Sequence, residues 1–200
     1  MRDEVADMID VAYDLQGGML PSVYAFALWR ELVRALPWLE AEQLAGVLPL
    51  RASESGEQML LPQRAKLVLR LPQHQAHQAQ QLSGRTLDVD GYALQIGAAR
   101  QKPLQVHPAL HAQLVASAGD ENEFLAEVAG RLRELEIAGK WICGRRVVLQ
   151  GGEREIAGYS LVVHELQAEG SLQLQQIGLG GERRYGCGIF VPCKDIPHFD

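Results

Sequence analysis

The sequence has few of the features that mark exported or membrane-spanning proteins. Its 200 residues include three cysteines, an odd number that argues against a disulfide framework, so we expect Cys143, Cys187 and Cys193 to be reduced. No run approaches the ~20 apolar residues that span a membrane. The N-terminal MRDEVADMID is acidic where a secretory signal is basic and apolar. We therefore expect a cytoplasmic protein without a membrane partner.

The chain also lacks an excess of positive charge. Nineteen Lys and Arg against 25 Asp and Glu give a formal net charge of −6, whereas nucleic-acid-binding domains often have a pI above about 9. This balance argues against a protein that holds long duplexes by bulk electrostatics. A protein that recognises one short structured RNA can gather its cations on a single face, so local clusters matter more than the total.

With 47% apolar residues, the chain suits one large domain or two of about 100 residues each. In the first half, MIDVAYDLQ (8–16) alternates apolar and polar residues, which predicts a half-buried strand. Ser22 is a candidate N-cap for a helix over 23–36, and Pro37 is its predicted end. GVLPLRA, from Gly46, predicts a short strand.

The segment QRAKLVLRL alternates cleanly and predicts a second long strand. Its leucines share one face, which leaves Arg64, Lys66 and Arg70 on the other as a basic strand face. A helix is predicted over 73–82. TLDVDGYALQIG then predicts a hairpin in which Asp90-Gly91 supplies the turn with positive φ.

The second half is predicted to repeat this order of elements. HPALHAQLVAS is a strand, and Asp120 with Glu123 forms a capping box that opens a helix. Two strands joined through Gly151-Gly152, a short helix ending at Gly178 and the strand CGIFVP complete it. Each half thus reads βαββαβ. The predicted fold class is α+β, with two tandem ferredoxin-like (RRM-like) domains over residues 1–104 and 105–200.

A glycine-rich segment, GLGGERRYGCGIF (178–190), surrounds two arginines with five glycines. It has neither the spacing of a dinucleotide fingerprint nor the Lys-Ser/Thr of a P-loop. One interpretation is a loop whose backbone approaches a phosphate closely, with Arg183 and Arg184 beside its amides. The alternative is a tight connection that binds no ligand.

The same segment carries a resemblance to a known family. SLQLQQIGLGGERRYGCGIFVPCK is similar to the C-terminus of the repeat-processing endoribonucleases of MYXAN-type CRISPR systems, which belong to the RAMP superfamily. LSGRTLDVDGYALQIG and LPSVYAFALWRELVRALPWL extend the resemblance to most of the chain. It implies two RRM-like domains that bind the repeat of a CRISPR precursor transcript and cut it into guide RNAs without a metal or cofactor.

The implied chemistry is attack of a ribose 2′-OH on the adjacent phosphate. It needs a base for that proton, an acid for the 5′-oxygen and a cation for the phosphorane charge. The resemblance implies a histidine base near the first helix, but Tyr24 occupies the aligned position. A tyrosine is a poor base at neutral pH, so Tyr24 is a candidate proton donor or positioning group. Arg34 and His111 complete the candidate catalytic set.

The predicted RNA contacts are cations and glycine amides, since arginine forks hold phosphates well. They are Arg64, Lys66, Arg70, Gly178, Gly180, Gly181, Arg183, Arg184, Gly186 and Gly188. Two alternatives to the nuclease stay open. One is an RNA-binding RAMP subunit of a CRISPR effector complex that has lost cleavage, and the other is a ferredoxin-like homodimer that binds no RNA.

Overall fold

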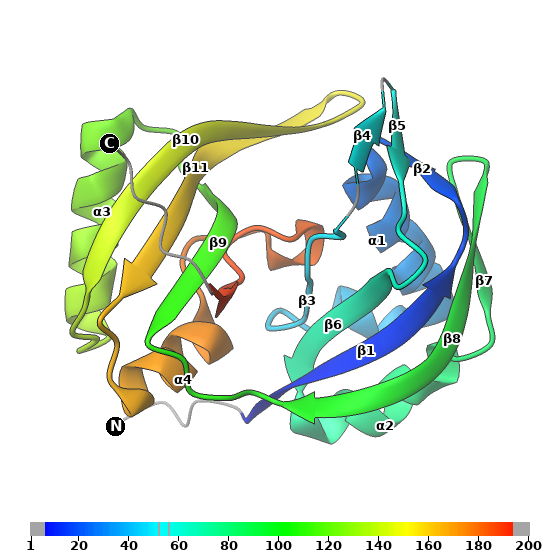
Figure 1. The fold of residues 1–200 in the computed structure, drawn as a ribbon, viewed down its shortest axis with the longest axis horizontal. Coiled ribbons are helices and arrows are strands. Elements are labelled where there is room, and N and C mark those ends of the chain that lie inside the picture. The colour runs from blue at the N-terminus through cyan, green and yellow to red at the C-terminus, as the bar shows by residue number, and fades with distance from the viewer. Residues whose placement is uncertain (1–6, 52, 56, 194–200) are drawn as a thin grey trace. The chain divides into compact units, whose positions relative to one another are not determined.

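The computed structural model describes residues 7–51, 53–55 and 57–193. The chain divides into two compact units. The first comprises Asp7–Pro103 with Gly151–Glu153, and the second comprises Leu104–Gln150 and the chain from Arg154 onward. Both combine curled antiparallel sheets with helices, so the architecture is α+β (Figure 1). Among the described residues, no helix has the length and apolar character needed to cross a membrane.

A five-stranded sheet in the order β3-β6-β1-β8-β7 forms the first unit. Its central strand β1 covers Met8–Gln16, which confirms the predicted strand, and pairs with β6 and β8. The other strands are β3 (Gly46–Val47), β6 (Lys66–Pro72), β7 (Thr86–Val89) and β8 (Tyr92–Pro103). The strand predicted from Gly46 is therefore only two residues long.

The helices of the first unit follow its strands in the predicted order. They are α1 (Tyr24–Ala35), the 3₁₀ helix η1 (Pro37–Glu40), and the short series η2 (Gln73–Gln75), α2 (Ala76–Ala79) and η3 (Gln80–Leu82). Pro37 ends α1 as predicted. The predicted Ser22 N-cap is wrong, because Val23 holds that position without a side-chain capping bond. The Ser22 amide instead donates to the Glu57 carbonyl.

The two faces of this sheet differ in composition. Tyr13 donates its hydroxyl hydrogen to the Ala79 carbonyl at 2.6 Å, which places α2 on the face that carries Tyr13. Leu67 and Leu69 of β6 are buried, as their alternation predicts. Alternation puts Asp10 and Asp14 of β1 on the opposite face. The first unit thus has an apolar face covered by helices and a second face that carries charged side chains.

A hairpin turn and a small second sheet complete the first unit. The β7–β8 hairpin turns at Asp90 and Gly91, whose φ values of 50° and 87° confirm the predicted turn, and the Asp88 carboxylate accepts the Gly91 amide hydrogen at 2.7 Å. A small sheet in the order β2-β5-β4 lies outside the predictions. Its strands are β2 (Met19–Pro21), β4 (Ser53–Ser55) and β5 (Gln58–Leu60).

The second unit contains a four-stranded sheet in the order β10-β11-β9-β12. Its strands are β9 (Ala109–Ala116), β10 (Lys140–Gly151), β11 (Arg154–His164) and β12 (Val191–Pro192). Its helices are α3 (Glu121–Glu134), α4 (Ala168–Ile177) and the 3₁₀ helix η4 (Arg183–Tyr185). The last strand is shorter than predicted, because residues 187–190 are buried without strand pairing.

Both long helices of the second unit cover one face of its sheet. The predicted capping box is confirmed: Asp120 accepts the Glu123 amide hydrogen and Glu123 accepts that of Asp120, each at 3.0 Å. Phe124 of α3 and Leu174 of α4 belong to one buried core with Leu161 of β11. Since alternate strand residues face opposite ways, His111 lies on the face of β9 opposite to the one that α3 and α4 cover.

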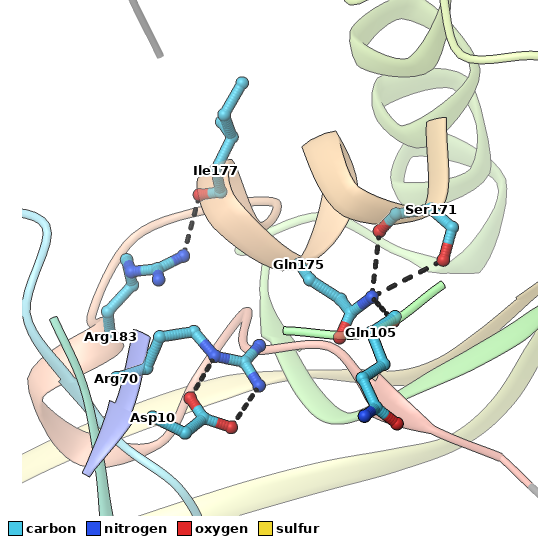
Figure 2. Close-up of polar contacts among 7 residues, drawn as sticks. All are labelled: Asp10, Arg70, Gln105, Ser171, Gln175, Ile177 and Arg183. Atoms are coloured by element: carbon cyan, nitrogen blue, oxygen red, sulfur yellow. Dashed lines mark hydrogen bonds and ion pairs between the residues drawn. The ribbon is translucent and has the colours of Figure 1, made fainter. Parts of the chain in front are cut away.

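A buried amide network fixes the start of α4 against the segment that precedes β9. The Gln175 side-chain nitrogen donates to the carbonyls of Gln105 and Ser171 at 2.8 and 3.2 Å (Figure 2). The Ser171 hydroxyl in turn accepts the His107 amide hydrogen at 2.9 Å. Buried polar side chains remain stable only when such partners replace water, so this network helps to place the loop that follows α4.

Candidate functional site

The glycine-rich loop, residues 178–190, is closely packed and has a backbone that only glycine adopts easily. Gly178, Gly180, Gly186 and Gly188 have φ values between 66° and 88°. A Cβ on Gly178 would meet the Gly188 carbonyl oxygen, and a Cβ on Gly188 would meet the Leu179 carbonyl oxygen. These glycines therefore let two stretches of the loop backbone pack directly against each other.

Most of the glycine amides of the loop bond within the protein. The Gly178 amide donates to Leu174 O at 2.9 Å, the Gly186 amide to Arg183 O at 3.0 Å and the Gly188 amide to Leu114 O at 2.7 Å. A phosphate cannot bind these three N–H groups while those bonds hold. Gly180 and Gly181 are exposed, so they are the loop glycines whose backbone faces solvent.

The two arginines of the loop have different environments. Arg183 is 7% exposed, and its Nη1 donates to the Ile177 carbonyl at 2.7 Å (Figure 2). It thereby satisfies a carbonyl at the C-terminus of α4, where a cation also complements the helix dipole. Arg184 is exposed. The two arginines predicted to lie beside the glycine amides are thus an internal side chain that caps α4 and a surface cation.

A third arginine holds the loop from β11. Arg154 donates from Nη2 to Glu182 Oε1 at 2.6 Å and from Nη1 to the Tyr185 hydroxyl at 3.1 Å. Its guanidinium carbon lies 5.0 Å from the centre of the Tyr185 ring. Glu182 has a left-handed backbone with φ 63°. The first and last residues of the segment 182–185 are therefore both tied to the start of β11.

The basic strand face is only partly available to a ligand. Arg64 is exposed in the turn before β6, and Lys66 lies 3.3 Å from Asp14. Arg70 is 1% exposed and donates from Nε and Nη2 to the two carboxylate oxygens of Asp10 at 2.7 and 3.0 Å (Figure 2). Arg70 shares the predicted basic strand face, but its guanidinium is buried against the carboxylate of Asp10, sixty residues away in the sequence.

Two cations that the sequence predictions omitted belong to the same face of the first sheet. Arg100 lies across from Ala12 and Lys102 across from Asp10 in the β1–β8 register, and both are exposed. Arg100 lies 3.3 Å from Asp14, which also pairs with Lys66. The sequence signal that could have identified them is the two-residue spacing of Arg100 and Lys102 in AARQKP, which puts both side chains on one face of a strand.

Tyr24 lies in the first turn of α1, and its hydroxyl oxygen accepts the Leu50 amide hydrogen at 2.9 Å. Burial raises the pKa of Tyr24, and the Leu50 amide offsets only part of that rise. The hydroxyl therefore stays protonated at neutral pH. It suits a proton donor or a positioning group and does not suit a general base.

The other candidate catalytic residues are Arg34, in the same unit as Tyr24, and His111, in the second unit. Arg34 is in the last turn of α1, ten residues further on, which is about 15 Å along a helix. Its side chain is 80% exposed and lies 3.9 Å from Glu31. His111 belongs to the second unit, where it is opposite Val162 and Val191 in the sheet. Burial lowers the pKa of His111, so its imidazole is neutral and able to accept a proton near pH 7.

Two solved structures illustrate the fold that this chain shares with known proteins. A "CRISPR associated protein Cas6" superposes with a TM-score of 0.68 at 8% identity, covering 94% of this chain and all of that one. "An RAMP protein binding different RNA substrates" gives a TM-score of 0.64 at 9% identity, covering 91% of this chain and 98% of that one. The fold is therefore that of the RAMP and Cas6 structures.

Sequence similarity identifies the family within that fold. The family model Cas6, described as "Cas6 Crispr", matches residues 9–195. The CRISPR-associated endonuclease Cas6 of Myxococcus xanthus strain DK1622 is 33% identical over 186 residues, which are 92% of this chain and 81% of that protein. The chain belongs to the Cas6 family.

Proposed function

We propose that this protein binds the hairpin of a CRISPR repeat RNA and cleaves it into guide RNAs by metal-independent attack of a ribose 2′-OH. The observation that carries the proposal is the match to the Cas6 family across residues 9–195. The 33% identical relative from Myxococcus xanthus is itself named an endonuclease. Cleavage would then depend on cations and titratable side chains of the two units.

We propose that each unit is a ferredoxin-like domain, with domains over residues 1–104 and 105–200. Apart from the small sheet β2-β5-β4, both units follow the chain order strand, helix, two strands, helix and a final strand or hairpin. In the large sheet of the first unit β1 lies between β6 and β8, and in the sheet of the second unit β9 lies between β11 and β12. The helices of the second unit share one face of their sheet, which leaves the other face for RNA.

The cleavage chemistry assigns a role to each candidate by its protonation state. The 2′-oxygen forms a bond to phosphorus, and the bond from phosphorus to the 5′-oxygen breaks. A base takes the proton of the 2′-hydroxyl, and an acid gives a proton to the 5′-oxygen. Each candidate is proposed separately: neutral His111 suits a base in the second unit, and protonated Tyr24 suits an acid or a ribose-orienting group in the first. Arg34 supplies a permanent cation for the phosphorane.

The RNA contacts divide into exposed groups and supporting groups. Arg64, Lys66 and Arg184 are the predicted cations that retain exposed surface, and the backbone of Gly180 and Gly181 allows a phosphate to approach closely. Arg70 and Arg183 act from inside, through Asp10 and the Ile177 carbonyl. Gly178, Gly186 and Gly188 shape the loop. We therefore expect Arg184→Gln to weaken RNA binding without a loss of folding.

A second candidate function is an RNA-binding subunit of a CRISPR effector complex that has lost cleavage. The observation that favours it is the buried hydroxyl of Tyr24 at the position where the family resemblance implies a histidine. The two candidates predict the same RNA affinity and differ only in cleavage. A cleavage assay therefore separates them, while retention on a repeat-RNA column tests the homodimer that binds no RNA.

The test is to incubate the protein with its own repeat RNA in EDTA, beside a substrate with 2′-deoxyribose at the cut position. Cleavage of the all-ribose substrate in EDTA and none of the deoxy substrate is the expected result. Cleavage that requires a divalent cation, or that proceeds on the deoxy substrate, would contradict the proposed chemistry. Tight binding without any cleavage would assign the chain to the RNA-binding subunit.

A further inference from the structure

We infer that Arg154 is a positioning residue that fixes the segment 182–185 of the glycine-rich loop so that Arg184 is held ready for an RNA phosphate. The inference rests on the proposed function. Arg154 was not among the residues that the sequence marked, because its partners lie 28 and 31 positions further along the chain. Its role emerges only from the contacts between β11 and the loop.

The contacts of Arg154 use both ends of its guanidinium. One end donates to the Glu182 carboxylate at 2.6 Å, and the other to the Tyr185 hydroxyl at 3.1 Å. Two hydrogen bonds from one rigid, cationic planar group define the distance between the two acceptors. The side chains of Arg154 and Glu182 are 49% and 31% exposed, so the ion pair adds little to the free energy of unfolding. Its main effect is to fix the position of the loop.

Backbone bonds convert this side-chain contact into a fixed turn. The Glu182 carbonyl accepts the amide hydrogens of Tyr185 at 3.0 Å and Cys187 at 3.3 Å. Arg183, the next residue, is anchored on the Ile177 carbonyl. These contacts hold the segment 182–185 inside the unit while Arg184 is exposed. A cation on a fixed turn loses less conformational entropy when it binds a phosphate.

Glu182 distinguishes a positioning role from a direct contact of Arg154 with RNA. If Arg154 simply attracts phosphates, Glu182 opposes it, and Glu182→Gln should tighten RNA binding by removing a negative charge. If Arg154 positions the loop through Glu182, the same substitution should weaken binding, because the charge-assisted bond is lost. The two roles therefore predict opposite signs for one substitution that keeps the size of the side chain.

The experiment measures repeat-RNA affinity and amide hydrogen exchange for the wild type and four single variants. Arg154→Gln and Glu182→Gln break the contact, and Arg184→Gln removes the exposed cation. Arg131→Gln is the matched control, since it removes a cation that pairs with Glu134 at 2.6 Å on α3. Exchange is read on peptides that cover residues 179–187.

We expect Arg154→Gln and Glu182→Gln each to weaken RNA binding by about three- to tenfold and to speed exchange in the loop. Arg184→Gln should weaken binding and lower the slope of log affinity against log salt by about one. Arg131→Gln should change neither binding nor exchange. Tighter binding by Glu182→Gln, or unchanged loop exchange in Arg154→Gln, overturns the inference. A wild type without affinity for repeat RNA overturns the proposed function as well.

Discussion

Substitution of Gly188 by alanine should destabilise the second unit strongly. Gly188 has φ 66°, and a left-handed backbone costs a residue with a Cβ about 1–2 kcal/mol. The new Cβ would also meet the Leu179 carbonyl oxygen, so the backbone must move, at roughly 1–3 kcal/mol for forced overpacking. The sum is about 2–5 kcal/mol. For a domain of about 100 residues this corresponds to a fall in Tm of roughly 8–40 °C.

The assay is thermal unfolding followed by circular dichroism, with Gly181→Ala as the matched control. Among the described residues, no atom beyond its chain neighbours lies within 4 Å of the position that a Cβ on Gly181 would take, and the φ of Gly181 is not positive. We expect its alanine variant to stay within about 0.5 kcal/mol of the wild type. Equal stability of the Gly188→Ala protein and the wild type would refute the packing role of the loop glycines. It would favour the alternative that Gly188 serves close approach by a ligand.

Three further results are expected. Arg70→Ala should lower the free energy of unfolding in urea by about 2–4 kcal/mol, because it leaves Asp10 without its guanidinium; a loss below about 0.5 kcal/mol would contradict this. Because the folded pKa of His111 lies below its ordinary value near 6.5, the unfolded chain binds more protons and stability falls as the pH drops below 6.5. His111→Gln should reduce that fall, and equal pH profiles would refute it. Burial, with the charge of Glu182, raises the pKa of Cys187 to about 12, so iodoacetamide at pH 8 should alkylate it only after unfolding, as peptide mass spectrometry can check.

Local signals in the sequence predicted most elements of the fold. The capping box of Asp120 and Glu123, the Asp90-Gly91 turn and the alternation along β1 each depend on residues close in sequence, and each is confirmed. The small sheet β2-β5-β4 was missed because its strands are three residues long, too short for a periodic pattern. Ser22 was misassigned because the N-cap of α1 is the next residue, Val23, while Ser22 lies in the turn after β2 with its amide bonded to the Glu57 carbonyl.

The candidate site was less predictable, because its side chains are defined by distant partners. The sequence predicts the same RNA-binding role for Arg70, Arg183 and Arg184. In the structure Arg70 pairs with Asp10, and Arg183 donates to the Ile177 carbonyl. The glycine pattern indicated that another group packs closely against the loop backbone. In the structure that group is a second stretch of the loop backbone, which lies against Gly178 and Gly188.

Analysis of the ends of the RNA products tests the central claim most directly. Attack by the 2′-OH on the adjacent phosphate leaves a 2′,3′-cyclic phosphate on one fragment and a 5′-hydroxyl on the other, whichever residue acts as the base. We expect mass spectrometry of the cleaved repeat RNA to show this pair of ends. A 3′-hydroxyl with a 5′-phosphate would mean that water attacked the phosphate, and would contradict the proposed mechanism.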